Sequence, residues 1–155
     1  MMTDVSCPTD IVNAPLAVVW ALLTDPAGWA NFFDIRIIRI DPPGPAAVGQ
    51  RIYAESGPRY LHLGVTLEYT DIDAARRAIG LNVQLPLRIT VREDLTCSFV
   101  TETQCRVSYR CDFGFPLGWR GAIARMILRR EMVSGPADSL SRLKHAAEVQ
   151  FLSSS

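Results

Sequence analysis

Residues 11–33 constrain the fold of this chain most, because they predict two short helices between a strand and a long β-rich run. Pro15 lies at the expected start of the first helix, where its fixed φ and missing N–H are tolerated. Thr24-Asp25-Pro26 ends that helix and begins the second, with Asp25 accepting hydrogen bonds from free N–H groups. Apolar residues recur at helical spacing along both helices: Val18, Val19, Leu22, Leu23, Trp29, Phe32 and Phe33.

Seven stretches have the composition of β-strands: 5–12, 34–41, 48–56, 60–70, 78–90, 91–100 and 104–113. Two of them alternate clearly, and their apolar faces are formed by Leu61, Leu63, Val65, Leu67, Tyr69, Ile79, Leu81, Val83, Leu85, Leu87 and Ile89. Pro8 and Pro86 must each bend or interrupt their strands. The short connections favour an antiparallel meander, and the single apolar face indicates that one side of the sheet packs or encloses something.

From Leu117 onward the apolar spacing becomes that of a helix. The expected apolar side consists of Trp119, Ile123, Met126, Ile127, Met132, Leu140, Leu143, Ala147 and Phe151. Ser134-Gly135-Pro136 lies in the middle and predicts a kink or a break. The order strand, two helices, six strands and a long helix is α+β, and we expect the 155 residues to form one domain, 1–155.

Charge and composition argue against several classes of function. Sixteen basic residues balance sixteen acidic ones, so there is no electrostatic case for nucleic acid. The longest apolar run is about half of what a membrane span needs, and no signal-peptide pattern is present, so we expect a cytoplasmic protein without integral membrane association. The arginines of the last helix could favour an anionic membrane or a partner, but an ordinary surface helix has the same pattern.

The four cysteines lack C-x-x-C spacing and are expected to be free thiols, although Cys97 and Cys105 could face each other across a hairpin. No set of ligands predicts a metal site or a cofactor. His62 falls on the polar strand face and His145 on the terminal helix, so neither is expected to act in catalysis. The inward face of the strands offers almost no acid or base, and no catalytic residue is predicted.

Three tyrosines are the polar residues of most interest. Tyr53, Tyr69 and Tyr109 could each donate a hydrogen bond to a ligand carbonyl or phenolate, or could be ordinary core tyrosines. Arg88 falls on the polar phase with Arg106, Arg110 and Asp112, where cross-strand ion pairs are expected. A slip of the strand phase at Pro86 would instead turn Arg88 inward.

The N-terminal segment resembles the signature of the START-like or polyketide cyclase/dehydrase (SRPBCC) superfamily in Ala14-Pro15, Val19-Trp20, Leu22-Leu23, Asp25-Pro26 and Trp29. Residues 48–50 and 140–144 also resemble that superfamily. The resemblance implies the helix-grip fold: a curved antiparallel sheet of six to seven strands around a long C-terminal helix, with two short helices after the first strand. It also implies an apolar cavity, since members bind lipids, sterols, quinones, polyketides or plant hormones, and some are aromatase/cyclases.

We therefore expect this chain to bind, transport or sense a hydrophobic small molecule: a lipid, polyketide, quinone or aromatic compound. One alternative is a polyketide cyclase or dehydratase, and another is an interaction module whose cavity is filled by its own side chains. An exposed sheet edge would allow a homodimer. The expected ligand-binding residues are Trp29, Phe33, Tyr53, Leu63, Val65, Leu67, Tyr69, Leu81, Val83, Ile89, Val107, Tyr109, Trp119, Ile123 and Ile127.

Overall fold

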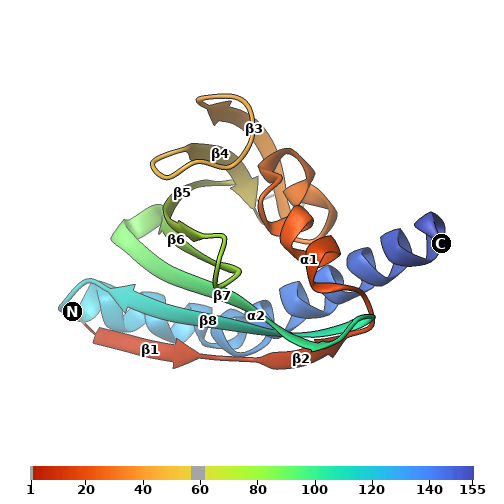
Figure 1. The fold of residues 1–155 in the computed structure, drawn as a ribbon. Coiled ribbons are helices and arrows are strands. Elements are labelled where there is room, and N and C mark those ends of the chain that lie inside the picture. The colour runs from red at the N-terminus through yellow and green to blue at the C-terminus, as the bar shows by residue number, and fades with distance from the viewer. Residues whose placement is uncertain (1, 57–61) are drawn as a thin grey trace.

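A computed structural model describes residues 2–56 and 62–155, and Figure 1 shows a curved antiparallel sheet with a long helix along its concave side. Its strands are β1 (Met2–Ser6), β2 (Thr9–Val12), β3 (Ile35–Asp41), β4 (Arg51–Ser56), β5 (Leu63–Asp73), β6 (Ala78–Leu85), β7 (Ile89–Thr101) and β8 (Gln104–Phe115). Its helices are α1 (Leu16–Leu23), the 3₁₀ helices η1 (Pro26–Asn31) and η2 (Pro86–Arg88), and α2 (Trp119–Ser154). The helix-grip prediction is confirmed; positions 60 and 61 of the predicted 60–70 strand lie outside the described residues.

The strands pair in the order β1-β8-β7-β6-β5-β4-β3, and β2 also pairs with β8. All of these pairs are antiparallel, as predicted. The predicted first strand, 5–12, is two strands along the same partner, interrupted at Pro8, whose carbonyl accepts a 2.9 Å hydrogen bond from the Tyr109 N–H. Proline has no N–H to give the ladder, so the pairing stops and restarts around it.

The two predicted helices of residues 11–33 are present as α1 and η1. Pro15 is the N-cap of α1 and not its first helical residue, so the helix begins one residue later than expected. The Asp25 side chain makes no capping hydrogen bond to η1. Val19 and Leu23 of α1 are fully buried, as are Trp29 and Phe32. These helices pack against β3 and the C-terminal half of α2, and Figure 1 shows them closing one end of the curved sheet.

The predicted strand 78–90 is confirmed over 78–85 and is interrupted at Pro86 as expected, but the chain reverses direction there and residues 89–90 belong to the next strand. β6 ends at Leu85, η2 forms a tight turn, and β7 returns antiparallel with Ile89 opposite Leu85. Leu87 and Arg88 both have positive φ, 65° and 60°, which allows the reversal. Arg88 therefore lies at the tip of a turn and does not face inward.

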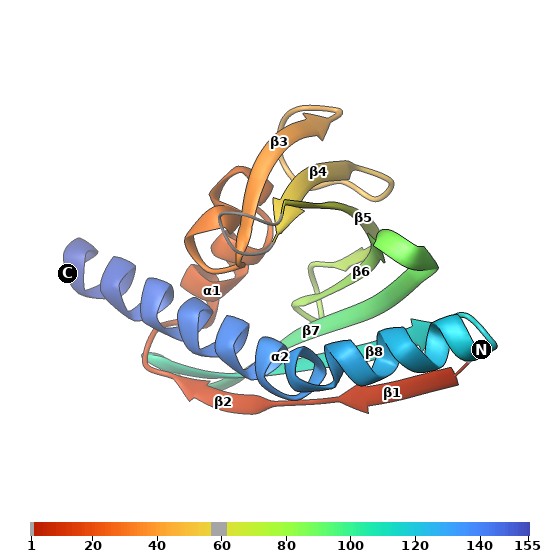
Figure 2. The same cartoon turned by 180° about the vertical axis from the view of Figure 1, so that it is seen from behind.

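The long helix α2 runs without a break through Pro136, and Figure 2 shows that it bends near its middle. The predicted apolar side is confirmed in the C-terminal half, where Leu140, Leu143 and Ala147 are buried. In the N-terminal half it holds for Met132 but is wrong for the other predicted residues, which are exposed, and Gly121 and Ala124 are buried instead. A Cβ on Gly121 would lie 1.7 Å from the Pro116 carbonyl oxygen, so only glycine permits this approach. No helix among the described residues is long and apolar enough to cross a membrane.

Candidate functional site

A cavity of about 250 Å³ lies between the concave face of the sheet and the middle of α2. About half of its lining residues are alternate residues of the strands β5 to β8. Its lining consists of Phe33, Asp34, Ile35, Ser56, Val65, Leu67, Val83, Leu85, Val91, Glu93, Tyr109, Cys111, Phe113, Glu131, Gly135, Pro136, Asp138, Ser139 and Arg142.

Strand register explains the apolar wall. Leu67 is paired with Val83, Val83 with Val91, and Val91 with Phe113, so these four side chains form one row across four strands. Paired residues of an antiparallel sheet project to the same face. The alternation read from the sequence therefore places Leu67 and Val83 correctly toward the interior.

The next inward row contains a carboxylic acid that the sequence interpretation missed. Glu93 lies two residues beyond Val91 and is paired with Leu81 on one side and Cys111 on the other. Its Oε2 is buried and has no hydrogen-bond partner among the described residues. The signal was available, because Val91, Glu93 and Leu95 alternate in one phase.

Burial raises the pKa of Glu93 from its ordinary 4.5 to about 7, and the neighbouring Tyr109 hydroxyl opposes part of that rise. Desolvation penalises the charged form of the carboxyl, which is the usual origin of such a shift. At neutral pH both protonation states of Glu93 are therefore populated. The carboxyl can donate a hydrogen bond in one state, accept in the other, and transfer a proton between them.

Tyr109 and Cys111 lie beside this carboxyl on β8. Burial raises the pKa of Tyr109 well above its usual value, and the charge on Glu93 adds to the rise. Burial raises the pKa of the Cys111 thiol in the same way. Both groups are therefore neutral at pH 7, which makes Cys111 a poor nucleophile and leaves Tyr109 as a hydrogen-bond donor.

Of the three tyrosines considered from the sequence, the structure brings only Tyr109 to the cavity. The Tyr69 hydroxyl donates a 2.8 Å hydrogen bond to the Leu23 carbonyl, and its ring packs 5.1 Å from that of Trp29, centroid to centroid. Tyr53 lies on the opposite face of β4 from buried Ile52 and Ala54. Its ring is covered by the Arg39 guanidinium at 4.4 Å from the centroid.

The other expected ligand-binding residues fall into distinct places. Phe33, Val65, Leu67, Val83 and Tyr109 line the cavity. Trp29, Tyr69, Leu81 and Val107 are buried in the surrounding core, Ile89 belongs to a second buried cluster under the start of α2, and Leu63 is half-buried. Trp119, Ile123 and Ile127 are exposed around a separate surface hollow.

The rim of the cavity is charged and mostly acidic. Asp34, Glu131 and Asp138 are exposed there, and Arg142 Nη1 lies 3.9 Å from Asp34 Oδ1. His62 and His145 are exposed and do not line it. In the described part of the chain, no three histidine, cysteine or acidic residues gather as metal ligands would. The four cysteines are free, with Cys7 exposed and the other three buried.

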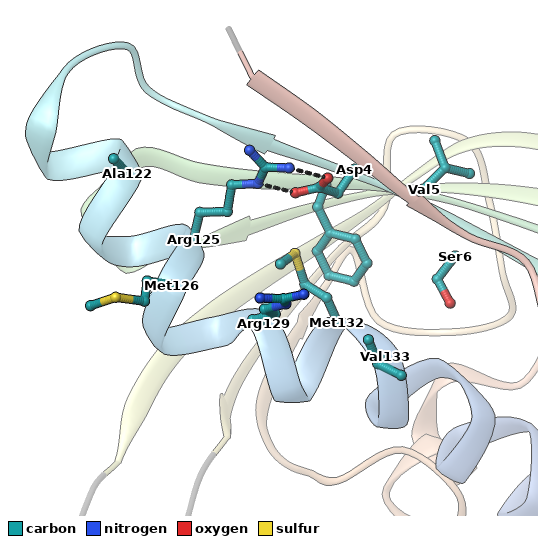
Figure 3. A pocket seen from close by; sticks show the side chains of 10 residues that line it. Asp4, Val5, Ser6, Ala122, Arg125, Met126, Arg129, Met132 and Val133 are labelled. Carbon is teal, nitrogen blue, oxygen red and sulfur yellow. Dashed lines mark hydrogen bonds and ion pairs between the residues drawn. The ribbon is translucent and has the colours of Figure 1, made fainter.

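A larger hollow, about 780 Å³, lies between β1 and the N-terminal half of α2. Figure 3 shows Arg125 of α2 reaching across it to Asp4 of β1, with nitrogen–oxygen distances of 2.5 and 2.7 Å. Arg125 and Asp4 therefore neutralise each other's charge. The interior cavity is the better candidate site, because its buried carboxyl Oε2 remains unpartnered.

A curved antiparallel sheet around a C-terminal helix, with an interior cavity, defines a helix-grip protein. The profile of the family described as polyketide cyclase / dehydrase and lipid transport matches residues 5–148, and the chain belongs to that family. A comparison with curated protein sequences finds no match.

Solved structures with this fold include the Zhui aromatase/cyclase from Streptomyces sp. R1128, at 17% identity and a TM-score of 0.71 over 95% of this chain and 94% of that one. Norcoclaurine synthase from Thalictrum flavum, in complex with dopamine and hydroxybenzaldehyde, has 12% identity and a TM-score of 0.68 over 94% and 86%. A protein from Thermus thermophilus has 11% identity and a TM-score of 0.74 over 95% and 99%. At these identities the likeness concerns the fold.

Proposed function

We propose that this protein binds a compact hydrophobic small molecule in its interior cavity, with Glu93 and Tyr109 making the polar contacts. The observation that carries the proposal is the buried, unpartnered Oε2 of Glu93 on a wall that is otherwise largely apolar. A buried polar group without a partner costs free energy, and a ligand that supplies the partner recovers it.

The cavity constrains the class of ligand. Its volume of about 250 Å³ is just below the range of typical small-molecule sites, about 300–1,000 Å³, which favours a small ring system over a long chain. The neutral Tyr109 hydroxyl can donate one hydrogen bond, either to Glu93 or to a ligand, and Glu93 can donate or accept one. The acidic rim disfavours ligands with a negative charge. We therefore propose a neutral or cationic aromatic compound that carries at least one hydroxyl, amine or carbonyl group.

Two probes that differ by one hydroxyl test this proposal: naphthalene and 2-naphthol. We expect wild-type protein to bind both, and 2-naphthol about tenfold more tightly, because its O–H reaches a buried carboxyl. Glu93→Gln should reduce that preference, and Val83→Phe should weaken the binding of both probes by filling the cavity. Glu102→Gln changes an exposed glutamate on the β7–β8 hairpin and is the matched control.

Titrations followed by 2-naphthol fluorescence, with naphthalene as competitor, give the dissociation constants. Equal affinity for the two probes would contradict the role of Glu93. Affinities unchanged in the Val83→Phe protein would contradict the cavity as the binding site. Native mass spectrometry of protein purified from its own host would then identify the natural ligand.

The pKa of Glu93, about 7, also favours a second function, acid–base catalysis on the bound ligand. The family and the fold include cyclase-type enzymes, so a polyketide-like carbonyl compound is the substrate class to test. For an enzyme, Glu93→Gln would retain the probe in the cavity but abolish turnover. For a carrier, no substrate of this class would be converted by the wild type.

A further inference from the structure

A second hollow, about 540 Å³, lies at one end of the molecule, between η2 and the start of α2. Figures 1 and 2 both show η2 and the N-terminal turns of α2 at the same end. Large apolar side chains surround it and are exposed to an unusual degree: Leu87 74%, Leu117 74%, Trp119 70% and Ile127 67%. Single exposed apolar residues are normal on a protein surface, whereas a cluster of them marks an interaction surface.

The backbone holds these side chains outward. Leu87 and Arg88 are consecutive non-glycine residues with φ of 65° and 60°, in a region that L-residues seldom adopt. Such conformations persist where the surroundings impose them, and they gather at functional segments. On the other side, the contact of Gly121 with the Pro116 carbonyl fixes the start of α2, so that Trp119 projects into solvent.

The hollow is also cationic. Arg88 and Arg120 line it, no acidic residue does, and the first turn of α2 contains no acidic residue. Within the described residues, neither arginine lies within 4.0 Å of a carboxylate, and the same holds for Arg129 and Arg130 further along α2. Arg51 on β4 and Arg110 on β8 differ from these, since each pairs with an acid.

We propose that this end of the protein docks on the surface of an anionic lipid bilayer. Leu87, Leu117 and Trp119 would enter the interface, and the guanidinium groups of Arg88 and Arg120 would contact lipid phosphates. Tryptophan and leucine beside arginine suit the boundary between headgroups and acyl chains, and arginine binds phosphate through paired N–H donors. The hollow combines exposed apolar side chains with two arginines that have no carboxylate partner among the described residues. An anionic bilayer complements it, because the bilayer surface has both apolar acyl chains and negatively charged phosphates.

An acidic protein is the competing partner, but the apolar residues fit it less well. They come from separate segments and are each two-thirds or more exposed, so they project as individual side chains around the hollow. A fluid interface accepts separate side chains, whereas a stable protein interface needs about 800 Å² of complementary surface per partner. The bilayer proposal is independent of the ligand proposed for the interior cavity.

Sedimentation with lipid vesicles tests the proposal. We expect wild-type protein to bind vesicles of phosphatidylcholine and phosphatidylglycerol at 7:3 and to stay in solution with phosphatidylcholine alone. Binding should weaken as salt is raised, because the attraction is screened. The double variant Arg88→Gln/Arg120→Gln should lower the partition coefficient by about 25-fold, since each arginine near an anionic surface contributes about a fivefold factor. Leu87→Ser/Trp119→Ser should lower it at least as much.

Matched controls remove the same charge or apolar area elsewhere. Arg76→Gln/Arg106→Gln changes two exposed arginines, and Phe99→Ser changes a side chain that is 66% exposed near the β7–β8 hairpin. These variants should bind like the wild type, and circular dichroism shows whether each variant is folded. The proposal is overturned if the wild type binds neither kind of vesicle, or if the controls lose as much binding as Arg88→Gln/Arg120→Gln and Leu87→Ser/Trp119→Ser. It is also overturned if this end of the protein binds an acidic protein and no vesicles.

Discussion

Two tyrosines on the concave face of the sheet, Tyr69 and Tyr109, have opposite environments. Tyr69 belongs to an aromatic end, formed with Trp29, Phe32 and Phe33, where its hydroxyl is already bonded to the Leu23 carbonyl. Tyr109 belongs to a cavity end, formed with Glu93 and Cys111, where a buried carboxyl oxygen has no partner among the described residues. Burial raises the pKa of both hydroxyls, so burial alone does not distinguish them.

The comparison teaches that a binding site is marked by an unpartnered polar group that faces a cavity, and not by the tyrosine itself. Trp29 Nε1 is also buried without a partner among the described residues, but Trp29 does not line the cavity, whereas Glu93 does. Phe33 connects the two ends, because its ring packs against Trp29 at 5.4 Å and lies 6.3 Å from Tyr109, centroid to centroid. The aromatic end stabilises the fold, and the cavity end keeps a polar requirement that a ligand can satisfy. Substitutions at the two ends should therefore have different consequences.

Removing the largest side chain of the aromatic end should have the largest effect on stability. Trp29→Ala leaves a void in a fully buried position, and we expect a loss of about 3–5 kcal/mol in the free energy of unfolding. Urea denaturation measures it. Trp119→Ala, at an exposed position, is the matched control and should change stability by less than about 0.5 kcal/mol. Similar losses in both variants would show that the aromatic end does not dominate the core.

Glu93 should make stability depend on pH in a direction opposite to that of a salt-bridged acid. Its pKa in the folded state, about 7, lies above the ordinary 4.5, so the folded protein holds this proton more tightly than the unfolded chain does. The resulting stability is present in full below about pH 4.5 and is lost as pH rises through 7. The full difference is about 3 kcal/mol.

Glu93→Gln removes this dependence. We expect the variant to equal the wild type in stability near pH 4.5 and to exceed it by up to about 3 kcal/mol at pH 8. Urea denaturation at pH 5, 6, 7 and 8 gives the comparison, with Glu102→Gln as the exposed control. Parallel pH profiles for wild type and Glu93→Gln would contradict the environment assigned to this carboxyl.

Tyr69→Phe should have a smaller effect that does not depend on pH between 5 and 8. The substitution removes one hydroxyl and leaves the Leu23 carbonyl without that donor, at a cost of about 1–2 kcal/mol. Tyr53→Phe, on the outer face of β4, is the matched control and should cost less than about 0.5 kcal/mol. If the two variants are equally stable, the buried hydrogen bond at the aromatic end contributes nothing.

Local sequence rules predict much of the fold. Proline placement located both short helices to within a residue or so, and alternation in 63–69 identified the inward residues of β5. The predicted strands 91–100 and 104–113 are confirmed as the hairpin of β7 and β8. Each of these features depends on neighbouring residues alone, which is why a sequence contains enough information for them.

The features that were missed depend on contacts between distant parts of the chain. Glu93 is the exception, because Ile89, Val91, Glu93 and Leu95 alternate in one phase, and local alternation was enough to place it inward. The rotation of α2 at its start is fixed by the approach of Gly121 to Pro116, which hydrophobic spacing cannot show. The acceptor of Tyr69 is the carbonyl at the end of α1, 46 residues away in the chain.

Tyr109→Phe should produce the smallest change in stability and the most specific change in electrostatics. The Tyr109 hydroxyl lowers the pKa of Glu93, so its removal should move that pKa above 7. The midpoint of the pH-dependent stability should shift upward with it, whereas Tyr69→Phe should leave the midpoint in place. Carbon-13 NMR of the Glu93 carboxyl follows the titration directly. An unchanged midpoint in Tyr109→Phe, or an equal shift in both variants, would mean that Tyr109 does not act on Glu93 and that the cavity end has no coupled polar pair.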